Sequence, residues 1–309
     1  MRAQDPSDGA CGMLGSVSEN DEYMSANRDL WDEWTGIHET SSFYDLEAFR
    51  RGGIRLRPFE IQDVGPVEGK SLLHLQCHFG IDTLSWARLG ALVTGADFSP
   101  KAIDLARRLA ADLGLDATFV CANLYDLPGM LDGTFDVVYT SRGVLGWLPD
   151  IPRWAEVAAG FVKPGGTFYI HEVHPVTQVW EDEDVDPGEL RLRYPYFTRP
   201  QPFAFDVVGS YADREAPVAA RTEFGWNHSM AEIVTSLARA GLRIDVLREF
   251  PYTEWEYPFL EARAEEPDEA RSEQPDGATE AGQTWWLPPQ VAGELPLFFA
   301  LKATKPEAG

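Results

Sequence analysis

Residues 71–100, SLLHLQCHFGIDTLSWARLGALVTGADFSP, hold an order of elements that few folds accommodate. The apolar run 72–75 predicts a buried strand, the turn at Gly80 leads into an amphipathic helix, and the run 92–96 predicts a second strand. In a parallel sheet these strands end at one edge, beside a crevice. Asp97 follows the second strand, and its two acceptor oxygens suit the vicinal diol of a ribose, so the segment predicts a site for an adenosine-like ligand.

The alternation of apolar strands and amphipathic helices continues along the chain and predicts an α/β protein. The fold class we predict is a Rossmann-like, doubly wound, mostly parallel seven-stranded sheet with an N-terminal helical cap and an inserted antiparallel aromatic lid after strand five. Further strands are predicted at 118–121, 135–139, 167–173, 242–250 and 295–303. Helices between them are predicted at 100–113, 154–162 and 230–240.

Composition shifts divide the chain into five predicted parts. The first residues are polar and Gly-rich, the next carry aromatic residues at helical spacing, and the segment after strand five is rich in Tyr and Phe. We therefore predict a disordered terminus over 1–20, a helical cap over 21–69, a ligand-binding core over 70–180 and 227–305, a substrate lid over 181–226 and a flexible acidic insertion over 261–283.

The charge balance restricts the kinds of molecule that the protein is expected to bind. The chain has 50 Asp and Glu against 26 Lys and Arg, a formal net charge of −24, and no basic stripe, so a nucleic acid substrate is not expected. Cys11, Cys77 and Cys121 have no metal-ligand spacing, so we predict reduced thiols and no metal site. The sequence has no export signal and no membrane-spanning run, so we expect a soluble cytoplasmic protein, a monomer or homodimer, that acts on a small molecule.

Two common nucleotide motifs are missing from the first turn. The dinucleotide fingerprint G-x-G-x-x-G does not occur there, which argues against a nicotinamide or flavin enzyme. The phosphate loop G-x-x-x-x-G-K-[ST] is also missing. A crevice lined with His and Gln suits a sulfonium better than a pyrophosphate.

Five short motifs together resemble the class I S-adenosylmethionine-dependent methyltransferases of the small-molecule type. They are LLHLQCHFG at strand one, GADFS after strand two, CANLYDLP after strand three, FDVVYTSRGVLGWLPD at strand four and FVKPGGTFYIHE at strand five. The resemblance covers residues 70–175 well and the end of the chain by topology alone. It implies S-adenosyl-L-methionine as cofactor.

The first motif departs from the family pattern of one acid and three glycines. His74 replaces the acid, Gln76 and His78 replace two of the glycines, and Gly80 remains. Two interpretations are open. Gln76 and His78 contact the amino-acid half of the cofactor themselves, or His74 and Gln76 satisfy backbone groups at a strand end.

The resemblance implies the residues of the cofactor site. Asn123 is expected beside the adenine, with a simple turn as the alternative, and Arg142 is expected beside the methionine portion, with an ordinary surface cation as the alternative. The full predicted set is Tyr23, Trp31, Gln76, Cys77, His78, Gly80, Asp97, Phe98, Ser99, Asn123, Leu124, Ser141, Arg142 and Gly143.

Methyl transfer requires alignment, exclusion of water and a deprotonated acceptor. Aromatic residues of the cap and lid are predicted to bind the substrate: Trp34, Trp147, Tyr211 and Trp226. At least one of Trp31 and Trp34 is expected to be plain packing. His174 and His228 are the candidate bases, and Glu172 is a candidate base or orienter for His174.

Each of these three residues also has a structural interpretation. Glu172 can pair with backbone groups or an arginine, His228 can cap the following helix, and some acceptors need no protein base. The function predicted is methyl transfer to an O, N or S atom of a small, aromatic or apolar molecule. The alternatives are a methyltransferase-fold enzyme that uses the cofactor structurally to promote a cyclisation or rearrangement, and a binding protein without activity.

Overall fold

A computed structural model describes residues 19–182, 185–186, 188–263, 284–291 and 295–307. Its centre is a seven-stranded sheet of order β3-β2-β1-β4-β5-β12-β8, in which β12 runs antiparallel to both of its neighbours and the first five strands are parallel. The strands are β1 (Ser71–Leu75), β2 (Leu92–Asp97), β3 (Ala117–Cys121), β4 (Phe135–Ser141), β5 (Val162–Val173), β8 (Arg243–Phe250) and β12 (Phe298–Thr304). The predicted Rossmann-like, mostly parallel sheet is confirmed.

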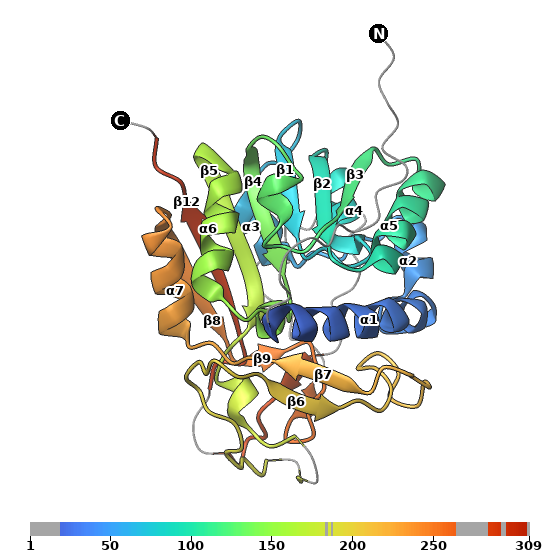
Figure 1. Cartoon of the computed structure of the whole chain (residues 1–309), viewed down its shortest axis with the longest axis vertical. Helices are drawn as coiled ribbons and strands as arrows, with labels where there is room; N and C mark the ends of the chain where they lie inside the picture. The colour runs from blue at the N-terminus through green and yellow to red at the C-terminus, as the bar shows by residue number, and fades with distance from the viewer. Residues whose placement is uncertain (1–18, 183–184, 187, 264–283, 292–294, 308–309) are drawn as a thin grey trace.

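Helices cover both faces of this sheet because consecutive residues of its strands point to opposite faces and are both apolar. On β4, Val137 and Tyr139 pack toward α3 and α4, whereas Val138 packs toward α6 and α7. Figure 1 shows α6 and α7 side by side on one face. The helices are α1 (Glu19–Thr40), α2 (Leu46–Arg50), α3 (Pro58–Val64), α4 (Ile81–Arg88), α5 (Pro100–Leu113), α6 (Ile151–Phe161) and α7 (Met230–Arg239).

The start and end of α5 follow from its sequence. The Ser99 side chain accepts a hydrogen bond from the Ala102 N–H, Pro100 occupies the first turn, and Gly114 ends the helix in a left-handed conformation. The buried stripe includes Ile103 and Leu109, so the helix packs firmly against the sheet beside the end of β2. The local signals alone predicted this element correctly.

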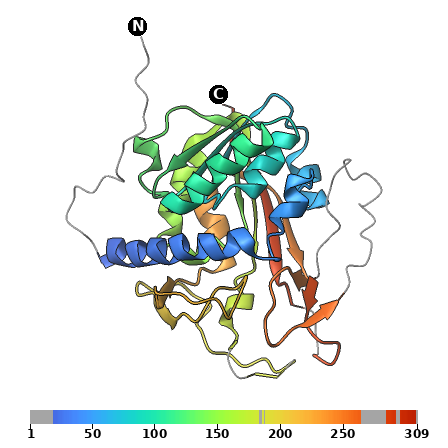
Figure 2. The ribbon, with the colours of Figure 1, turned by 90° about the vertical axis from the view of Figure 1, so that its right-hand side faces the viewer.

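Helix α1 runs across one end of the sheet, between the sheet and a small two-stranded sheet (Figures 1 and 2). The small sheet consists of the antiparallel strands β6 (Phe203–Asp206) and β7 (Thr222–Gly225), which belong to the predicted lid. Asn27 of α1 donates to the Phe224 carbonyl at 2.8 Å and accepts from the Phe224 N–H at 2.9 Å. The cap and the lid therefore meet over the end of the sheet where the parallel strands finish.

A third sheet was not expected. Strands β9 (Tyr252–Thr253), β10 (Glu261–Arg263) and β11 (Thr284–Trp286) pair in the order β10-β11-β9. The first residues of the predicted flexible insertion, 261–263, are thus a paired strand, while 264–283 and the predicted disordered residues 1–18 lie outside the described residues. The division of the chain into cap, core, lid and insertion remains a prediction.

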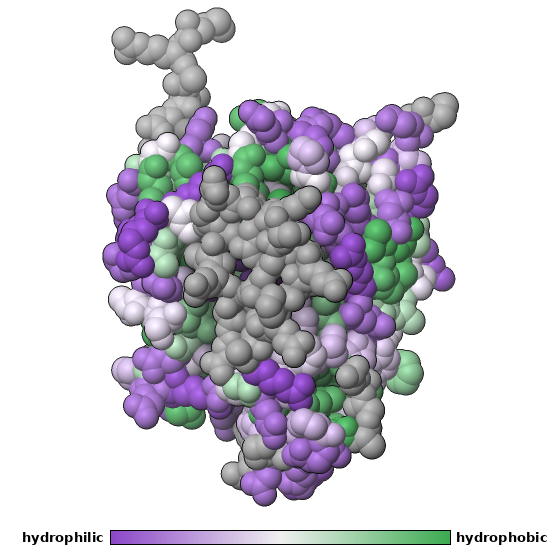
Figure 3. All heavy atoms as spheres, turned by 180° about the vertical axis from the view of Figure 1, so that it is seen from behind, coloured by the Kyte–Doolittle hydropathy of each residue, from purple (hydrophilic) through white to green (hydrophobic). Residues whose placement is uncertain are grey.

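Among the described residues, no helix combines the length and the apolar character that crossing a membrane requires. Figure 3 shows hydrophilic residues over much of the coloured rim of the rear face. This distribution agrees with a chain of net charge −24.

Candidate functional site

A hollow opens at the carboxyl ends of β1, β2 and β4, beneath α1. Its empty volume is about 1200 Å³, a value that includes space open to solvent. It is lined by Met24, Trp31, Phe43, Tyr44, Arg55, His74, Gln76, Cys77, His78, Phe79, Gly80, Ile81, Asp82, Ala96, Asp97, Phe98, Ala122, Leu124, Leu127, Ser141, Arg142, Gly143, Val144, Trp147, Leu148, Tyr211, Glu254 and Trp255.

The turn after β1 has an unusual backbone. Gln76, His78 and Gly80 have φ of 56°, 50° and 80°, so all three lie in the left-handed region. A residue other than glycine in this region costs about 1–2 kcal/mol of conformational free energy. The turn contains two such residues, Gln76 and His78. At Gly80 no side chain fits, because an added Cβ would lie 2.7 Å from the Phe119 ring. The turn therefore has three left-handed residues, of which only Gly80 is a glycine.

The two side chains that stand in place of glycines, Gln76 and His78, contact neighbouring elements. The Gln76 Nε2 donates to the Val144 carbonyl at 3.1 Å. The His78 Nε2 lies 2.9 Å from Nδ1 of His38 on α1, whose Nε2 lies 2.6 Å from the Ser210 Oγ of the lid. Burial lowers the pKa of both histidines, that of His38 to about 3, so both are neutral near pH 7.

Asp97 ends β2 at the wall of the hollow. One carboxylate oxygen accepts from the His78 N–H at 2.8 Å, and the other accepts from the Ser99 N–H at 2.9 Å. Burial raises the pKa of Asp97 to about 6, although these backbone hydrogen bonds oppose the shift. Each carboxylate oxygen has a second lone pair, so Asp97 keeps acceptor capacity for a ligand in the hollow.

Glu172 holds a loop in place. Its carboxylate accepts four backbone N–H groups, from Gly143 and Val173 at 2.6 Å, from Val144 at 2.7 Å and from Leu145 at 3.1 Å. Four bonds use all the acceptor sites of a carboxylate. Glu172 does not line the hollow, and the backbone-pairing interpretation describes its observed contacts.

The two histidines predicted as bases also lie away from the hollow. The His174 Nε2 is 3.0 Å from Glu249, and its Nδ1 accepts from the Val176 N–H at 3.1 Å. The His228 Nε2 lies 2.8 Å from the Leu148 carbonyl. Both rings are therefore occupied by structural contacts.

The predicted cofactor residues divide into two groups. Eleven of them line the hollow: Trp31, Gln76, Cys77, His78, Gly80, Asp97, Phe98, Leu124, Ser141, Arg142 and Gly143. Three do not: Tyr23 packs against the Phe224 ring, Ser99 caps α5, and Asn123 accepts from the Tyr125 N–H in a turn. The turn interpretation of Asn123 thus describes its observed contact.

The predicted substrate residues also divide. Trp147 and Tyr211 line the hollow, together with Trp31 of α1. Trp34 and Trp226 are buried behind them, with exposed fractions of 4% and 2%. The Trp34 Nε1 donates to the Gly209 carbonyl at 2.9 Å, so Trp34 fastens the lid to α1. One of the tryptophan pair Trp31 and Trp34 is therefore packing, as the sequence suggested.

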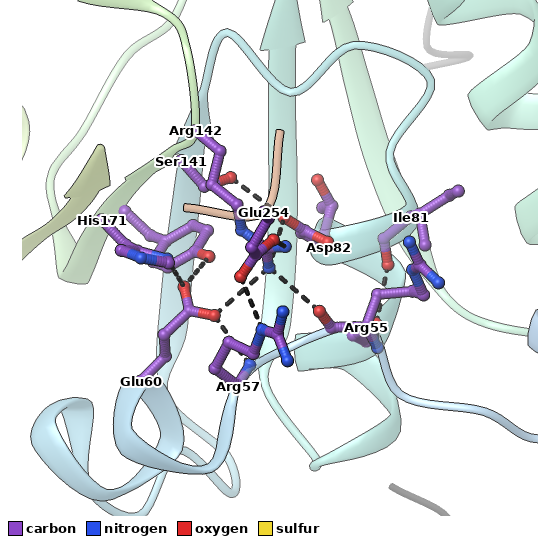
Figure 4. A network of polar contacts seen from close by, with 12 residues as sticks. Arg55, Arg57, Glu60, Ile81, Asp82, Ser141, Arg142, His171 and Glu254 are labelled. Carbon is purple, nitrogen blue, oxygen red and sulfur yellow. Dashed lines mark hydrogen bonds and ion pairs between the residues drawn. The ribbon is translucent and has the colours of Figure 1, made fainter. Parts of the chain in front are cut away.

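A largely buried network of charges, missed by sequence reasoning, lies at one wall of the hollow, which Asp82, Arg142 and Glu254 line (Figure 4). Arg142 donates to Glu254 at 2.8 Å and to Glu60 at 3.2 Å, and its Nη2 lies 3.5 Å from Asp82. Burial alone lowers the pKa of Arg142, but these three acids raise it well above its usual value. Arg142 is thus a largely buried cation, with 13% of its side chain exposed, and not an ordinary surface cation.

Sequence reasoning also missed other residues that line the hollow, and the sequence contains only a weak signal for them. Asp82 stands in the first turn of the helix that follows the β1 turn, where an acid is common near a helix N-terminus. Arg55 lies in the irregular segment between α2 and α3, and Trp255 follows β9. Only the tertiary structure brings these segments to one cavity.

Comparisons with known proteins agree with this fold. Residues 73–170 match the family model of a methyltransferase domain. The ubiquinone biosynthesis O-methyltransferase of Photorhabdus laumondii is 29% identical over 144 residues, which are 45% of this chain and 60% of that enzyme. The enzyme of the same name from Bordetella pertussis is 25% identical over 232 residues, which cover 75% of this chain and 83% of that enzyme.

A solved S-adenosylmethionine dependent methyltransferase from Mesorhizobium loti superposes with a TM-score of 0.51 at 20% identity, covering 80% of this chain and 96% of that one. This likeness shows the fold.

Proposed function

We propose that this chain, a class I S-adenosylmethionine-dependent methyltransferase by its fold and by the family model that residues 73–170 match, transfers a methyl group from S-adenosylmethionine to a small aromatic or apolar molecule. The observation that carries the proposal is the pairing of a left-handed turn after β1 with a buried carboxylate, Asp97, at the end of β2. Both face one hollow at the carboxyl ends of parallel strands.

The residues of the hollow fit an adenosyl ligand. Asp97 offers acceptors for the two ribose hydroxyls, and Leu124 and Leu127 offer an apolar wall for a purine ring. S-Adenosylmethionine would supply an electrophilic methyl group on a sulfonium. The chain's part is to hold that end of the ligand against the aromatic wall of Trp31, Trp147 and Tyr211, which excludes water.

The acceptor atom is proposed to be an oxygen, because the curated relatives reported above are named O-methyltransferases. The aromatic wall favours a planar or apolar acceptor. The three side chains predicted as bases, Glu172, His174 and His228, do not line the hollow, so the proposal assigns no proton transfer to them.

The remaining parts of the proposal concern the cap and the lid, the class of substrate, the location and the oligomeric state. Residues 21–69 and 181–226 act as a cap and a lid over the hollow, since Trp31 comes from one and Tyr211 from the other. The strong negative charge supports a small-molecule substrate over a nucleic acid. A cytoplasmic location and a monomer or homodimer remain part of the proposal.

Calorimetric titration with S-adenosylhomocysteine tests the cofactor assignment directly. We expect one site per chain, and we expect Asp97→Asn to weaken binding while Asp136→Asn does not. Asp136 is a matched control because it also accepts a backbone N–H, from Ser71, but does not line the hollow. Absence of binding heat with folded protein would reject the function. Methyl-labelled cofactor with a panel of phenols, amines and thiols then identifies the acceptor atom.

A further inference from the structure

The aromatic wall of the hollow carries a hydrogen-bonded pair of phenols, Tyr44 and Tyr211. Tyr44 follows α1, Tyr211 belongs to the predicted lid, and both line the hollow. Their hydroxyl oxygens share one hydrogen bond, which uses one of the two hydroxyl protons. Within the described residues neither oxygen has another hydrogen-bond partner. The phenol pair therefore has a second proton that it can donate to a ligand.

The phenol pair is a donor and not a base. Burial raises the pKa of Tyr44 and Tyr211, so both hydroxyls keep their protons near pH 7. The ring of His38 lies 5.0 Å from that of Tyr44 and 4.7 Å from that of Tyr211, and the ring of His78 lies 5.7 Å from that of Tyr44. Both histidines are neutral, because burial lowers their pKa.

Two indole N–H groups add further donors to this wall. Trp31 and Trp147 line the hollow, and their ring centroids are 5.2 Å apart. In the part of the chain that the structure describes, neither Nε1 has a hydrogen-bond partner, and neither nitrogen is buried. An indole nitrogen can donate a hydrogen bond but cannot accept one. An otherwise apolar wall thus presents several free donors.

The charges around the phenol pair do not exclude an anion. The negative charge of Asp82 raises the pKa of Tyr44, but the positive charges of Arg55 and Arg142 both lower it. S-Adenosylmethionine would bring a positive sulfonium to the same hollow. An anionic oxygen beside it would leave the two ligands with compensated charges, which reduces the cost of burying each.

We infer that the phenol pair, with the indoles of Trp31 and Trp147 beside it, binds the reacting oxygen of the acceptor as an anion. The acceptor class is then a planar ring that carries an ionisable hydroxyl, as in a phenol or an enol. This inference rests on the proposed function and deepens it, because it names the form in which the acceptor binds. Hydrogen bonds to the charged form lower the pKa of the bound hydroxyl, so its proton passes to solvent and no protein base is required.

The transfer then needs no further reactant. A lone pair of the anionic oxygen forms the new bond to the methyl carbon, and the carbon–sulfur bond breaks with its electron pair left on sulfur. The oxygen anion has more lone pairs than a single donor occupies, so the phenol pair can hold the oxygen while it reacts. The aromatic rings keep water away from the same oxygen.

Two probes test the inference on wild-type protein saturated with S-adenosylhomocysteine. 4-Nitrophenol and 4-nitroanisole share a ring, but only the phenol ionises, and its visible absorption reports the ionised fraction. At pH 6 we expect the ratio of anion to phenol to be about 10- to 100-fold higher for bound than for free 4-nitrophenol, the effect of a hydrogen bond to a charged oxygen. A bound ratio equal to the free ratio would overturn the inference.

A double variant then locates the donor. Tyr44→Phe/Tyr211→Phe keeps both rings and removes both hydroxyls, so the bound ratio should fall by about tenfold or more. The affinities for 4-nitroanisole and S-adenosylhomocysteine should stay unchanged. If the pair only fastened the lid, the variant would weaken both nitro probes alike, and that result would overturn the inference.

Tyr196→Phe is the matched control. Tyr196 is also a tyrosine of the predicted lid with a hydrogen-bonded hydroxyl, which accepts from the Met230 N–H at 3.1 Å, but it does not line the hollow. We expect this variant to give the wild-type ratio of anion to phenol. A fall as large as that of the double variant would show that the hydroxyls of Tyr44 and Tyr211 have no special role.

The outcomes separate this inference from the proposed function. If S-adenosylhomocysteine binds but neither nitro probe does, the cofactor assignment stands and the inference is overturned. The same holds if the double variant keeps the wild-type ratio. If S-adenosylhomocysteine does not bind folded wild-type protein, the proposed function fails, and this inference fails with it.

Discussion

The affinity for an adenosyl ligand should fall when the pH is lowered through 6, and Asp97 is the reason. The ribose diol donates hydrogen bonds, so it prefers the carboxylate to the carboxylic acid. Burial raises the pKa of Asp97 to about 6 in the free protein. The diol should lower that pKa again, so the ligand binds most tightly above pH 6 and loses affinity as Asp97 takes up a proton.

The size of the effect follows from the free-state pKa. If the bound pKa falls well below 5, the affinity at pH 5 is reduced by a factor of 1 + 10^(6−5), or about 11, relative to pH 8. His38 and His74 have pKa values lowered by burial to about 3, so they stay neutral over this range. Asp82, whose pKa is also raised, is the other buried acid of the hollow that can contribute.

The assay is calorimetric titration with S-adenosylhomocysteine at pH 5, 6, 7 and 8, with circular dichroism to check folding at each pH. Asp97→Asn should bind more weakly at pH 8 and lose most of the pH dependence. Repeating the titration near pH 6 in buffers of different ionisation enthalpy should show release of part of a proton per ligand bound. An affinity that is equal at pH 5 and pH 8, or a slope in Asp97→Asn as steep as in the wild type, would refute the reasoning.

Three further substitutions test the packing around the site by urea denaturation. Gly95→Ala should lower the free energy of unfolding by about 1–3 kcal/mol, because the added Cβ would lie 2.8 Å from the Phe119 ring; an unchanged value would contradict that crowding. Trp34→Phe should cost about 1–2 kcal/mol, since the Gly209 carbonyl loses its buried donor; a cost below about 0.5 kcal/mol would argue against this link between α1 and the lid. Glu172→Gln should cost about 3 kcal/mol, because its amide nitrogen would face backbone donors; wild-type stability would show that the loop does not depend on this carboxylate.

Much of the fold was predictable because its signals are local. The strands near 72–75 and 92–96 are short apolar runs, and α5 carries a Ser cap, Pro100 and a terminal Gly114. The positions of Gly80 and Asp97 at the hollow were also predictable, because the ends of neighbouring parallel strands meet at one edge.

The functions of the polar residues were less predictable, because they depend on contacts between distant segments. Glu172 and His174 were expected near the acceptor because they end a strand, but Glu172 is held by loop residues about 30 positions earlier and His174 by Glu249. The sequence gives no sign of such pairings.

Arg55 and Asp82 belong to no motif of the resemblance. Their common wall arises from the packing of the segment after α2 against α4.

The structure of a complex with S-adenosylhomocysteine tests the central claim most directly. The account predicts the ribose hydroxyls within hydrogen-bond distance of the Asp97 carboxylate. A nucleoside bound elsewhere, or a hollow that stays empty at saturating ligand, would contradict it.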